Sequence, residues 1–316
     1  MESVFSPRPQ VVHDAVHMAR ILVTGGAGFV GSAVVDALLA GGDDVVALDD
    51  LATGDRANVA LGVALIVADI SDASALERAL EGARFDAIVH CASRTKVLES
   101  IEKPDLYRRV IVDGTRNVLA VGSRCGARDF VNFSSGGVIY GETPACAGED
   151  TPPAPISPYG SCKATAERLV EGSGLRAVTL RPANIYGPRQ RTDLEGGVVA
   201  IFMRRWRERE PVHVRGDGSM ERDYVFVGDV ARAVVAALRS PGRGVYNVGT
   251  GVATSINALV AAMTAVLGPS PGVEHVAELP GELHRSCVDP ARAARELDWR
   301  PMTSLEEGLR ITATAV

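Results

Sequence analysis

The stretch ARILVTGGAGFVGS, at residues 19–32, decides the fold of this chain. An apolar strand runs directly into closely spaced glycines, Gly25, Gly28 and Gly31, and a helix-patterned segment follows. Glycines at this spacing allow a tight turn, a close approach of the backbone to a pyrophosphate, and close packing of the helix on the strand. The first amides of that helix would then face the phosphates. The stretch therefore predicts a dinucleotide-binding turn.

A carboxylate closes the next predicted strand, DVVALDD. Asp49 can accept hydrogen bonds from both ribose hydroxyls of an adenosine, and its charge would repel a 2′-phosphate. The pattern therefore favours NAD over NADP. The loop ADI after the third strand adds Asp69, which is either an adenine contact or an ordinary surface residue. The expected cofactor contacts from these stretches are Gly25, Gly28, Phe29, Val30, Asp49, Asp50, Asp69 and Ile70.

Short β-branched runs alternate with helix-patterned segments through the first half of the chain. The predicted strands are 21–25, 44–50, 64–70, 86–92, 129–135 and 177–183, and the clearest helices are 30–40, 73–81, 104–125 and 158–171. Strands and helices alternating at this spacing imply parallel pairing. The sequence thus predicts an α/β fold with a doubly wound, Rossmann-type parallel sheet.

Beyond residue 183 the pattern becomes irregular, with glycine and proline punctuation at YGPRQ, GDGS and GPSPG. This change predicts a smaller mixed α/β lobe towards the C-terminus that would bind the substrate. The expected division is an N-terminal extension at 1–18, a dinucleotide-binding domain at 19–182 plus about 224–250, and the second lobe at 183–223 and 251–316.

The composition is that of an ordinary globular protein, with 46% hydrophobic and 23% charged residues among 316. A net charge of −6 argues against a nucleic-acid partner, and no apolar run reaches the ~18 residues of a membrane span. The opening residues lack the apolar core of a signal peptide, which favours a cytoplasmic location. The cysteines show neither zinc-ligand nor paired spacing, so no metal site is expected. Reduced thiols are expected at Cys91, Cys125, Cys146, Cys162 and Cys287.

A second informative stretch is SPYGSCKATAE, at 157–167, where Tyr159 and Lys163 stand four residues apart. On a helix they share one face. The pKa of a free tyrosine is near 10, too high for a base at neutral pH. A neighbouring ammonium and the positive nicotinamide ring of NAD⁺ both favour the phenolate. In FSSGGVIYG, at the end of the fifth strand, Ser134 or Ser135 can donate to the oxygen that the tyrosine deprotonates.

Taken together, these stretches resemble an extended short-chain dehydrogenase/reductase of the nucleotide-sugar epimerase branch, along nearly the whole chain. The resemblance rests on TGGAGFVGS, LDDLATG, SSGGVIYGE, SPYGSCKATAE, LRPANIYGPRQ, GDGSMERDYVFVGDV and YNVGTGVATS, in that order. It implies that Tyr159 is the base, that Lys163 holds the nicotinamide ribose, and that Ser135, the serine nearer the turn, polarises the reacting hydroxyl.

The residues after the serine point to the reaction. Dehydratases of this branch carry an Asp-Glu pair there and similar decarboxylases usually keep a glutamate, whereas this chain has Gly136 and Gly137. The resemblance therefore implies 4-epimerisation of a UDP-sugar. Tyr159 would take the proton of the 4-hydroxyl while carbon 4 gives hydride to NAD⁺, and the hydride would return after the 4-keto sugar has turned. NAD would be regenerated in each turnover. A homodimer through the helices at 104–125 and 158–171 is also expected.

Further matches concern the nucleotide sugar. In the family, the arginine of GDG-x-x-x-RD holds the diphosphate, and Arg222 matches it. Asn184 matches the asparagine near the phosphate, and Arg285 would add a second charge. Arg191, in YGPRQRTDL, matches the arginine of UDP-glucuronate 4-epimerases that faces the sugar carboxylate. By contrast, Asn184 and the segment GGVVAIF, with Val199 as an expected substrate contact, are closer to neutral-sugar enzymes. UDP-glucuronate/UDP-galacturonate is thus the favoured substrate pair, and UDP-glucose/UDP-galactose the alternative.

Three departures from the family pattern leave details of cofactor and diphosphate binding open, one of them Gly228 in VGDV, where the family has an aspartate. Ile111 stands where an asparagine is usual, and Leu279 where an arginine is expected before PG. Two other classes of function also remain possible for this sequence. One is a nucleotide-sugar decarboxylase or dehydratase that uses acid and base groups from elsewhere in the chain. The other is a non-catalytic NAD(H)-binding regulator, although such proteins tend to lose the tyrosine or lysine that this chain keeps.

Overall fold

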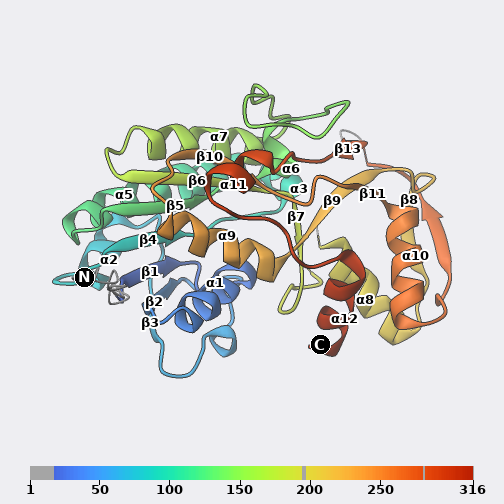
Figure 1. The fold of residues 1–316 in the computed structure, drawn as a ribbon, viewed down its shortest axis with the longest axis horizontal. Coiled ribbons are helices and arrows are strands. Elements are labelled where there is room, and N and C mark those ends of the chain that lie inside the picture. Colours follow the sequence, from blue (N-terminus) through green and yellow to red (C-terminus); the bar gives the residue numbers. More distant parts are fainter. Residues whose placement is uncertain (1–17, 194–196, 280–281, 316) are drawn as a thin grey trace, which may run out of the picture.

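The computed structural model describes residues 18–193, 197–279 and 282–315, so the predicted extension at 1–18 lies outside these ranges except for Met18. At its centre is a seven-stranded sheet of order β10-β6-β5-β4-β1-β2-β3, in which all neighbours pair in parallel (Figure 1). Each strand predicted from the sequence is present, and β10 completes the sheet. The strands are β1 (Arg20–Thr24), β2 (Asp44–Asp49), β3 (Ala64–Val67), β4 (Ala87–His90), β5 (Asp129–Phe133), β6 (Arg176–Pro182) and β10 (Gly244–Val248).

Helices cover both faces of this sheet, because its strands are apolar on both sides. On β1, Ile21 and Val23 share a core with α1 (Phe29–Ala40) and α9 (Val227–Arg239). Leu22, which points the other way, shares a second core with α2 (Ala73–Ala79) and α5 (Gly114–Arg124). The predicted doubly wound α/β fold is therefore confirmed.

Shorter helices complete this part of the molecule. The predicted helix at 104–125 is one helical run made of α4 (Pro104–Tyr107), a π-helical segment η2 (Arg108–Asp113) and α5. The other helices are η1 (Arg56–Asn58), α3 (Val97–Glu102), α6 (Gly136–Ile139), α7 (Pro158–Glu171) and α11 (Ala291–Glu296).

A second group of elements, on the right of Figure 1, lies apart from the central sheet. It has its own apolar core, to which Phe202, Trp206, Leu259 and Met263 contribute. Its larger sheet centres on β9 (Glu221–Phe226), which pairs with β7 (Asn184–Tyr186), β11 (Ala253–Ser255) and β13 (Arg285–Ser286). The remaining elements are the pair β8 (Val212–Arg215) and β12 (Val273–Val276) and the helices α8 (Val198–Glu208), α10 (Ile256–Leu267) and α12 (Leu305–Thr314). The domain division given above stays a prediction.

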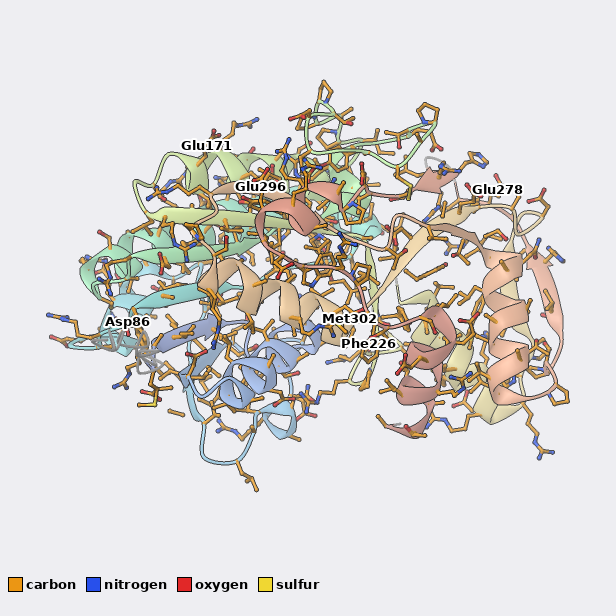
Figure 2. The ribbon with its side chains drawn as sticks, viewed as in Figure 1. Asp86, Glu171, Phe226, Glu278, Glu296 and Met302 are labelled. Carbon is orange, nitrogen blue, oxygen red and sulfur yellow. A yellow bond between two sulfur atoms is a disulfide. The ribbon has the colours of Figure 1, made fainter. Side chains whose placement is uncertain are left out.

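A buried carboxylate ties the C-terminal segment to the start of α9. Asp229 is fully buried and accepts hydrogen bonds from the backbone N–H groups of Met302 (3.1 Å) and Thr303 (3.0 Å). Phe226 and Met302 mark this junction in Figure 2. Because the buried charge has several donors, it holds the segment before α12 in place.

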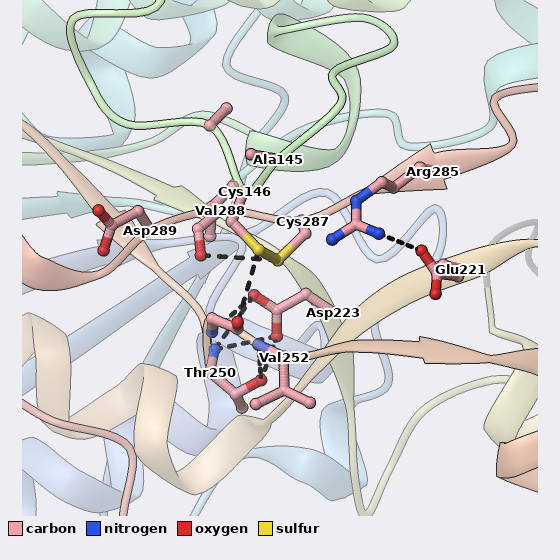
Figure 3. The surroundings of a disulfide bond; sticks show 12 residues. Ala145, Cys146, Glu221, Asp223, Thr250, Val252, Arg285, Cys287, Val288 and Asp289 are labelled. Carbon is pink, nitrogen blue, oxygen red and sulfur yellow. Dashed lines mark hydrogen bonds and ion pairs between the residues drawn. A yellow bond between two sulfur atoms is a disulfide. The ribbon is translucent and has the colours of Figure 1, made fainter.

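Two of the cysteines contradict the expectation of reduced thiols. Cys146 and Cys287 form a disulfide (Figure 3), whereas the other three cysteines are free. The physical reason is that their two segments run side by side. Ala147 donates to the carbonyl of Cys287, and Asp289 donates to the carbonyl of Ala147. Partners 141 residues apart leave no spacing signal in the sequence.

Candidate active site

The glycine-rich turn between β1 and α1 brings backbone segments too close for side chains. Gly25 has a φ of +70°, and a Cβ there would lie 2.7 Å from the backbone nitrogen of Ala92. At Gly31 a Cβ would lie 1.9 Å from the carbonyl oxygen of Gly25. Both positions therefore require glycine. The N-cap of α1 is Gly28, which has no side chain to occupy the first amides of the helix. Those amides suit a phosphate.

Asp49 lies buried at the end of β2, beside this turn. Its carboxylate accepts hydrogen bonds from the backbone N–H groups of Ala27 (3.0 Å) and Leu51 (2.8 Å). Burial raises the pKa of this carboxyl, and the backbone donors oppose that rise. The two donors fix the carboxylate while leaving lone pairs for further donors, such as ribose hydroxyls.

A cavity of about 1100 Å³ opens at the carboxyl ends of the parallel strands, where β1 and β4 lie side by side and the chain leaves them in opposite directions. It brings together all of the predicted cofactor contacts: Gly25, Gly28, Phe29, Val30, Asp49, Asp50, Asp69, Ile70, Tyr159 and Lys163. It also brings together four of the predicted substrate contacts besides Tyr159: Ser135, Asn184, Arg191 and Arg222. The glycine turn, the acidic strand end and the tyrosine helix thus share one site.

Two predicted substrate contacts do not line this cavity. Val199 is 2% exposed and packs in the core of the second group of elements, while its neighbour Val198 lines the cavity. Arg285 forms an ion pair with Glu221, and Figure 3 shows this pair next to the disulfide. Arg285 therefore holds β13 against β9.

The candidate catalytic side chains meet where α7 faces the end of β5. Ser157 caps α7 by accepting a hydrogen bond from the N–H of Gly160 (3.1 Å), so the helix begins just before Tyr159. Ser135 lies close enough to Tyr159 for its hydroxyl to lower the pKa of the phenol. The Lys163 ammonium donates to the carbonyl of Phe133 (2.8 Å) and lies 6.0 Å from the centroid of the Tyr159 ring.

Burial dominates the electrostatics of this cluster. It raises the pKa of Tyr159 to about 12, against the opposing hydrogen bond from Ser135. It also lowers the pKa of Lys163 to about 8. In the protein alone the ammonium therefore does not bring the tyrosine to a useful pKa. The positive nicotinamide ring of NAD⁺ has the charge that the phenolate still needs.

The two candidate serines have different surroundings. The hydroxyl of Ser135 lowers the pKa of Tyr159, whereas the Oγ of Ser134 is buried with no hydrogen-bond partner among the described residues. This difference supports Ser135 as the serine that acts with the tyrosine.

Besides Ser134 Oγ, three buried polar atoms on the wall of the cavity have no partner within the described part of the chain. They are Asn184 Oδ1, Gln190 Oε1 and the hydroxyl of Tyr224. Buried polar groups are nearly always hydrogen-bonded, so these atoms fit a polar ligand. Arg222, two residues before Tyr224 on β9, adds a guanidinium to the same wall.

Arg191 lines the cavity but already has partners. Its guanidinium donates to both carboxylate oxygens of Asp193 (2.9 and 2.7 Å) and to the carbonyl of Thr53 (3.0 Å). The side chain of Arg191 remains 47% exposed and that of Asp193 60%. A substrate carboxylate would therefore have to replace Asp193.

Several polar residues of the cavity were missed by sequence reasoning. They come from the loop after β4, from α8, from β8 and from the segment before β13: Arg94, Arg205, His213, Arg215 and Glu282. One signal was available, since VHVR alternates apolar and polar residues and so predicts a strand with one polar face. The other residues lie in no motif.

Two negative findings apply to the described ranges. They contain no group of three or more His, Cys, Asp or Glu residues that could hold a metal ion. None of their helices combines the length and apolar character needed to cross a bilayer.

The sequence and the fold were compared with those of known proteins. The family described as "Epimerase: NAD dependent epimerase/dehydratase family" matches residues 21–249. A UDP-glucose 4-epimerase of Mycolicibacterium smegmatis is 40% identical over 304 residues, which cover 93% of this chain and 97% of that protein. The crystal structure of a UDP-glucose 4-epimerase of Thermus thermophilus, in complex with NAD, is 41% identical, with a TM-score of 0.89 and coverage of 94% of this chain and 98% of its own. That of a UDP-glucose 4-epimerase of Thermotoga maritima, with UDP-glucose, is 37% identical, with a TM-score of 0.90 and the same coverage.

Proposed function

The chain belongs to the NAD-dependent epimerase/dehydratase family, and from that membership we propose that it is a UDP-sugar 4-epimerase interconverting UDP-glucose and UDP-galactose. The predicted resemblance to nucleotide-sugar epimerases and the NAD cofactor are confirmed by the same comparisons. The observation that carries the proposal is the meeting of Ser135, Tyr159 and Lys163 in one cavity with the glycine turn.

These residues can perform an oxidation and a reduction at one carbon. NAD, when bound, accepts a hydride and returns it. Tyr159 takes the proton of the 4-hydroxyl and gives it back to the same oxygen after the sugar has turned. Ser135 donates a hydrogen bond to that oxygen, and the charge of Lys163 favours the phenolate form of Tyr159.

The surroundings of Ser135 favour epimerisation over dehydration or decarboxylation. Gly136 and Gly137 open α6 directly after the serine, and Gly137 lines the cavity without offering an acid or a base. The carboxylates that line the cavity already have hydrogen-bond or ion-pair partners elsewhere. Asp49, Asp50 and Asp69 accept hydrogen bonds from backbone amides in the loops after β2 and β3. Glu282 pairs with Arg215 (3.0 Å). Chemistry at a second carbon therefore lacks a placed carboxylate among the described lining residues.

The proposed anchor of the nucleotide end is the wall formed by β7 and β9. Arg222 would pair with the diphosphate, and the unpartnered Asn184 and Tyr224 would bind polar groups of the nucleotide sugar. Holding the diphosphate there leaves the sugar able to turn about its linkage, which a 4-epimerase requires.

The neutral sugar is favoured because Arg191 is already neutralised by Asp193. The relatives named above are also called UDP-glucose 4-epimerases. UDP-glucuronate is a second candidate, since Arg191 lines the cavity and its ion pair with Asp193 is exposed enough to be exchanged for a substrate carboxylate.

The test is incubation of the purified protein with UDP-glucose and, separately, with UDP-glucuronate, followed by chromatographic resolution of the products. UDP-galactose formed from UDP-glucose supports the proposal. Conversion of the uronate alone replaces the first substrate by the second. If NAD binds but neither sugar is converted, the proposal fails and a regulatory NAD(H)-binding protein becomes the better account.

A homodimer through the face formed by η2, α5 and α7 belongs to the same proposal. This face carries the exposed Arg108 and Arg116, both paired with Asp113. Sedimentation velocity of the wild type and of the variant Arg116→Glu tests it. A dimer that dissociates in the variant supports the interface, and a monomeric wild type refutes it.

A further inference from the structure

A buried ion pair lies beside the catalytic helix. The Arg181 guanidinium donates from Nε to Oε1 of Glu167 (2.8 Å) and from Nη2 to Oε2 (2.6 Å). The two side chains are only 5% and 10% exposed. A bidentate contact of this kind fixes the direction of both groups.

The carboxylate of this pair is a neighbour of Lys163. Glu167 follows Lys163 by four residues on α7, so the two side chains stand on one face of the helix. The Lys163 ammonium nevertheless donates to the carbonyl of Phe133 (2.8 Å). Both oxygens of Glu167 are instead taken by Arg181. Arg181 thus keeps Glu167 from capturing the ammonium.

Arg181 is itself held in place. Its Nη1 donates to the hydroxyl of Tyr140 (2.8 Å), and that hydroxyl donates to Asn247 Oδ1 (2.8 Å). The guanidinium also lies 4.9 Å from the centroid of the Tyr140 ring. Since it is fixed from a second side, Arg181 cannot follow Glu167 towards Lys163.

Near neutral pH, Glu167 is the negatively charged side chain that acts on the Lys163 ammonium. The other titratable groups around the ammonium are His90 and Cys91 at the end of β4, and Tyr159 and Cys162 on α7. Burial lowers the pKa of His90 to about 3 and raises the pKa of both thiols and of Tyr159. These groups are therefore uncharged, and Glu167 opposes the loss of the Lys163 proton that burial favours.

We propose that Glu167 and Arg181 are positioning residues of the reaction. Glu167 keeps the buried Lys163 ammonium charged, and Arg181 keeps that ammonium directed at Phe133 and the cavity by occupying both oxygens of Glu167. The inference deepens the proposed function, because it rests on the roles given there to Tyr159 and Lys163.

The decisive variant replaces the whole pair, as Glu167→Met with Arg181→Met. Replacing both partners of a buried ion pair by apolar side chains is usually tolerated, whereas removing one leaves an unpaired buried charge. The variant should therefore fold, and Lys163 should lose its negative neighbour. The pKa of Lys163 should then fall by about one unit, and the alkaline limb of the kcat–pH profile should move down with it.

The pKa of Lys163 can be measured without turnover. The lysines of the chain are Lys96, Lys103 and Lys163, so ¹³C-lysine labelling gives a simple NMR spectrum, and Lys163→Arg assigns the signal. The matched control is Asp129→Asn with Arg176→Met, which removes another ion pair of β6 (2.6 Å), this one to β5 and not to α7. This control should leave the Lys163 titration in place.

A second variant distinguishes the charge of Lys163 from the direction in which its ammonium group points. Arg181→Lys keeps a cation but loses the bidentate contact, which frees one oxygen of Glu167 for Lys163. Here the pKa of Lys163 should rise while kcat falls about tenfold, since the ammonium turns away from the cavity. If the double Met variant does not fold, Glu167→Gln is used instead to measure the fall in the pKa of Lys163.

An unchanged Lys163 titration in the NAD-saturated double variant, together with an unmoved alkaline limb and a lower Tm, would make the pair merely structural and overturn the inference. Absence of epimerase activity in the wild type would instead overturn the proposed function. In that case the NMR titration of Lys163 still decides whether Glu167 controls the ammonium.

Discussion

The Lys163 ammonium lies 6.0 Å from the centroid of the Tyr159 ring, and its hydrogen bond goes to the backbone carbonyl of Phe133 rather than to the tyrosine. The pair that was expected to lower the pKa of the tyrosine is thus arranged around the end of β5, next to Ser135. Since burial raises the pKa of Tyr159 to about 12 despite the opposing effect of Ser135, we expect the phenolate to need the cationic nicotinamide ring as well. Proton transfer by Tyr159 would in this way depend on bound oxidised cofactor.

Loss of the Tyr159 hydroxyl should stop the chemistry and spare binding. For Tyr159→Phe we expect kcat to fall by about 10²–10⁴-fold, the usual contribution of a general base, with little change in the Kd of the UDP-sugar. Steady-state kinetics and calorimetric binding test this. Tyr246→Phe is the control, because that hydroxyl binds Glu296 and Arg243 outside the cavity. A variant that keeps more than a tenth of wild-type kcat would exclude Tyr159 as the base.

The buried ammonium should cost stability below its own pKa. The pKa of Lys163 is lowered from 10.5 to about 8 in the folded protein, so the unfolded chain binds more protons between these values and stability rises with pH there. Lys163→Met should therefore raise the Tm at pH 7, and this gain should shrink between pH 8 and pH 10.5. Thermal melts of both proteins across this range measure the difference. A gain that grows with pH would contradict the assigned shift.

The charge of Asp49 should set the choice of dinucleotide. Asp49→Asn keeps an acceptor for the backbone amide of Ala27 or Leu51 but removes the negative charge. We expect NAD to bind about tenfold more weakly and the gap between NAD and NADP to narrow. Calorimetry with both dinucleotides tests this, with Asp44→Asn at the other end of β2 as the control, since Asp44 is exposed and lies outside the cavity. An unchanged preference would place the selection elsewhere.

Arg191 should distinguish the two candidate substrates. If the neutral sugar is used, Arg191→Ala should leave kcat/KM for UDP-glucose within about threefold, because an exposed ion pair contributes little. If a uronate is used, the same change should lower kcat/KM for UDP-glucuronate by about a hundredfold or more. The nearby Arg189→Ala, which removes an ion pair with Asp36 (2.8 Å), is the matched control.

The disulfide should support the folded state. A cross-link between residues 141 apart stabilises by about 2–4 kcal/mol, so a dithiol reductant should lower the Tm of the wild type by about 3–6 °C. The reductant should leave the Tm of Cys146→Ser with Cys287→Ser unchanged. Equal melts of the wild type with and without reductant would show that the bond adds nothing.

Local patterns were enough to predict the sheet and most of the site. The strands, the helix of Tyr159 and Lys163, and the glycine turn all depend on residues close together in sequence, such as Gly25 and Gly31, so periodicity and spacing identify them. Asp49 and Ser135 could also be predicted, because each follows a parallel strand and ligands bind beyond the carboxyl ends of such strands.

What the sequence did not predict depends on contacts between distant segments. Cys146 meets Cys287 only because the loop after α6 runs beside the segment after β13. Val199 was expected at the substrate, but its place on α8 directs it into the core. The ion pair of Arg191 with Asp193 is local, yet a motif match gives a residue type and not its partners. The high pKa of Tyr159 likewise follows from burial, which no motif records.

The central claim is that this site oxidises and re-reduces one carbon of a UDP-sugar. The most direct measurement uses UDP-glucose carrying deuterium at carbon 4, incubated with the NAD-loaded protein in ordinary water, with NMR and mass analysis of the product. Our account predicts UDP-galactose that keeps the deuterium at carbon 4, with no net reduction of NAD. Deuterium lost to the solvent, or a product other than the 4-epimer, would contradict it.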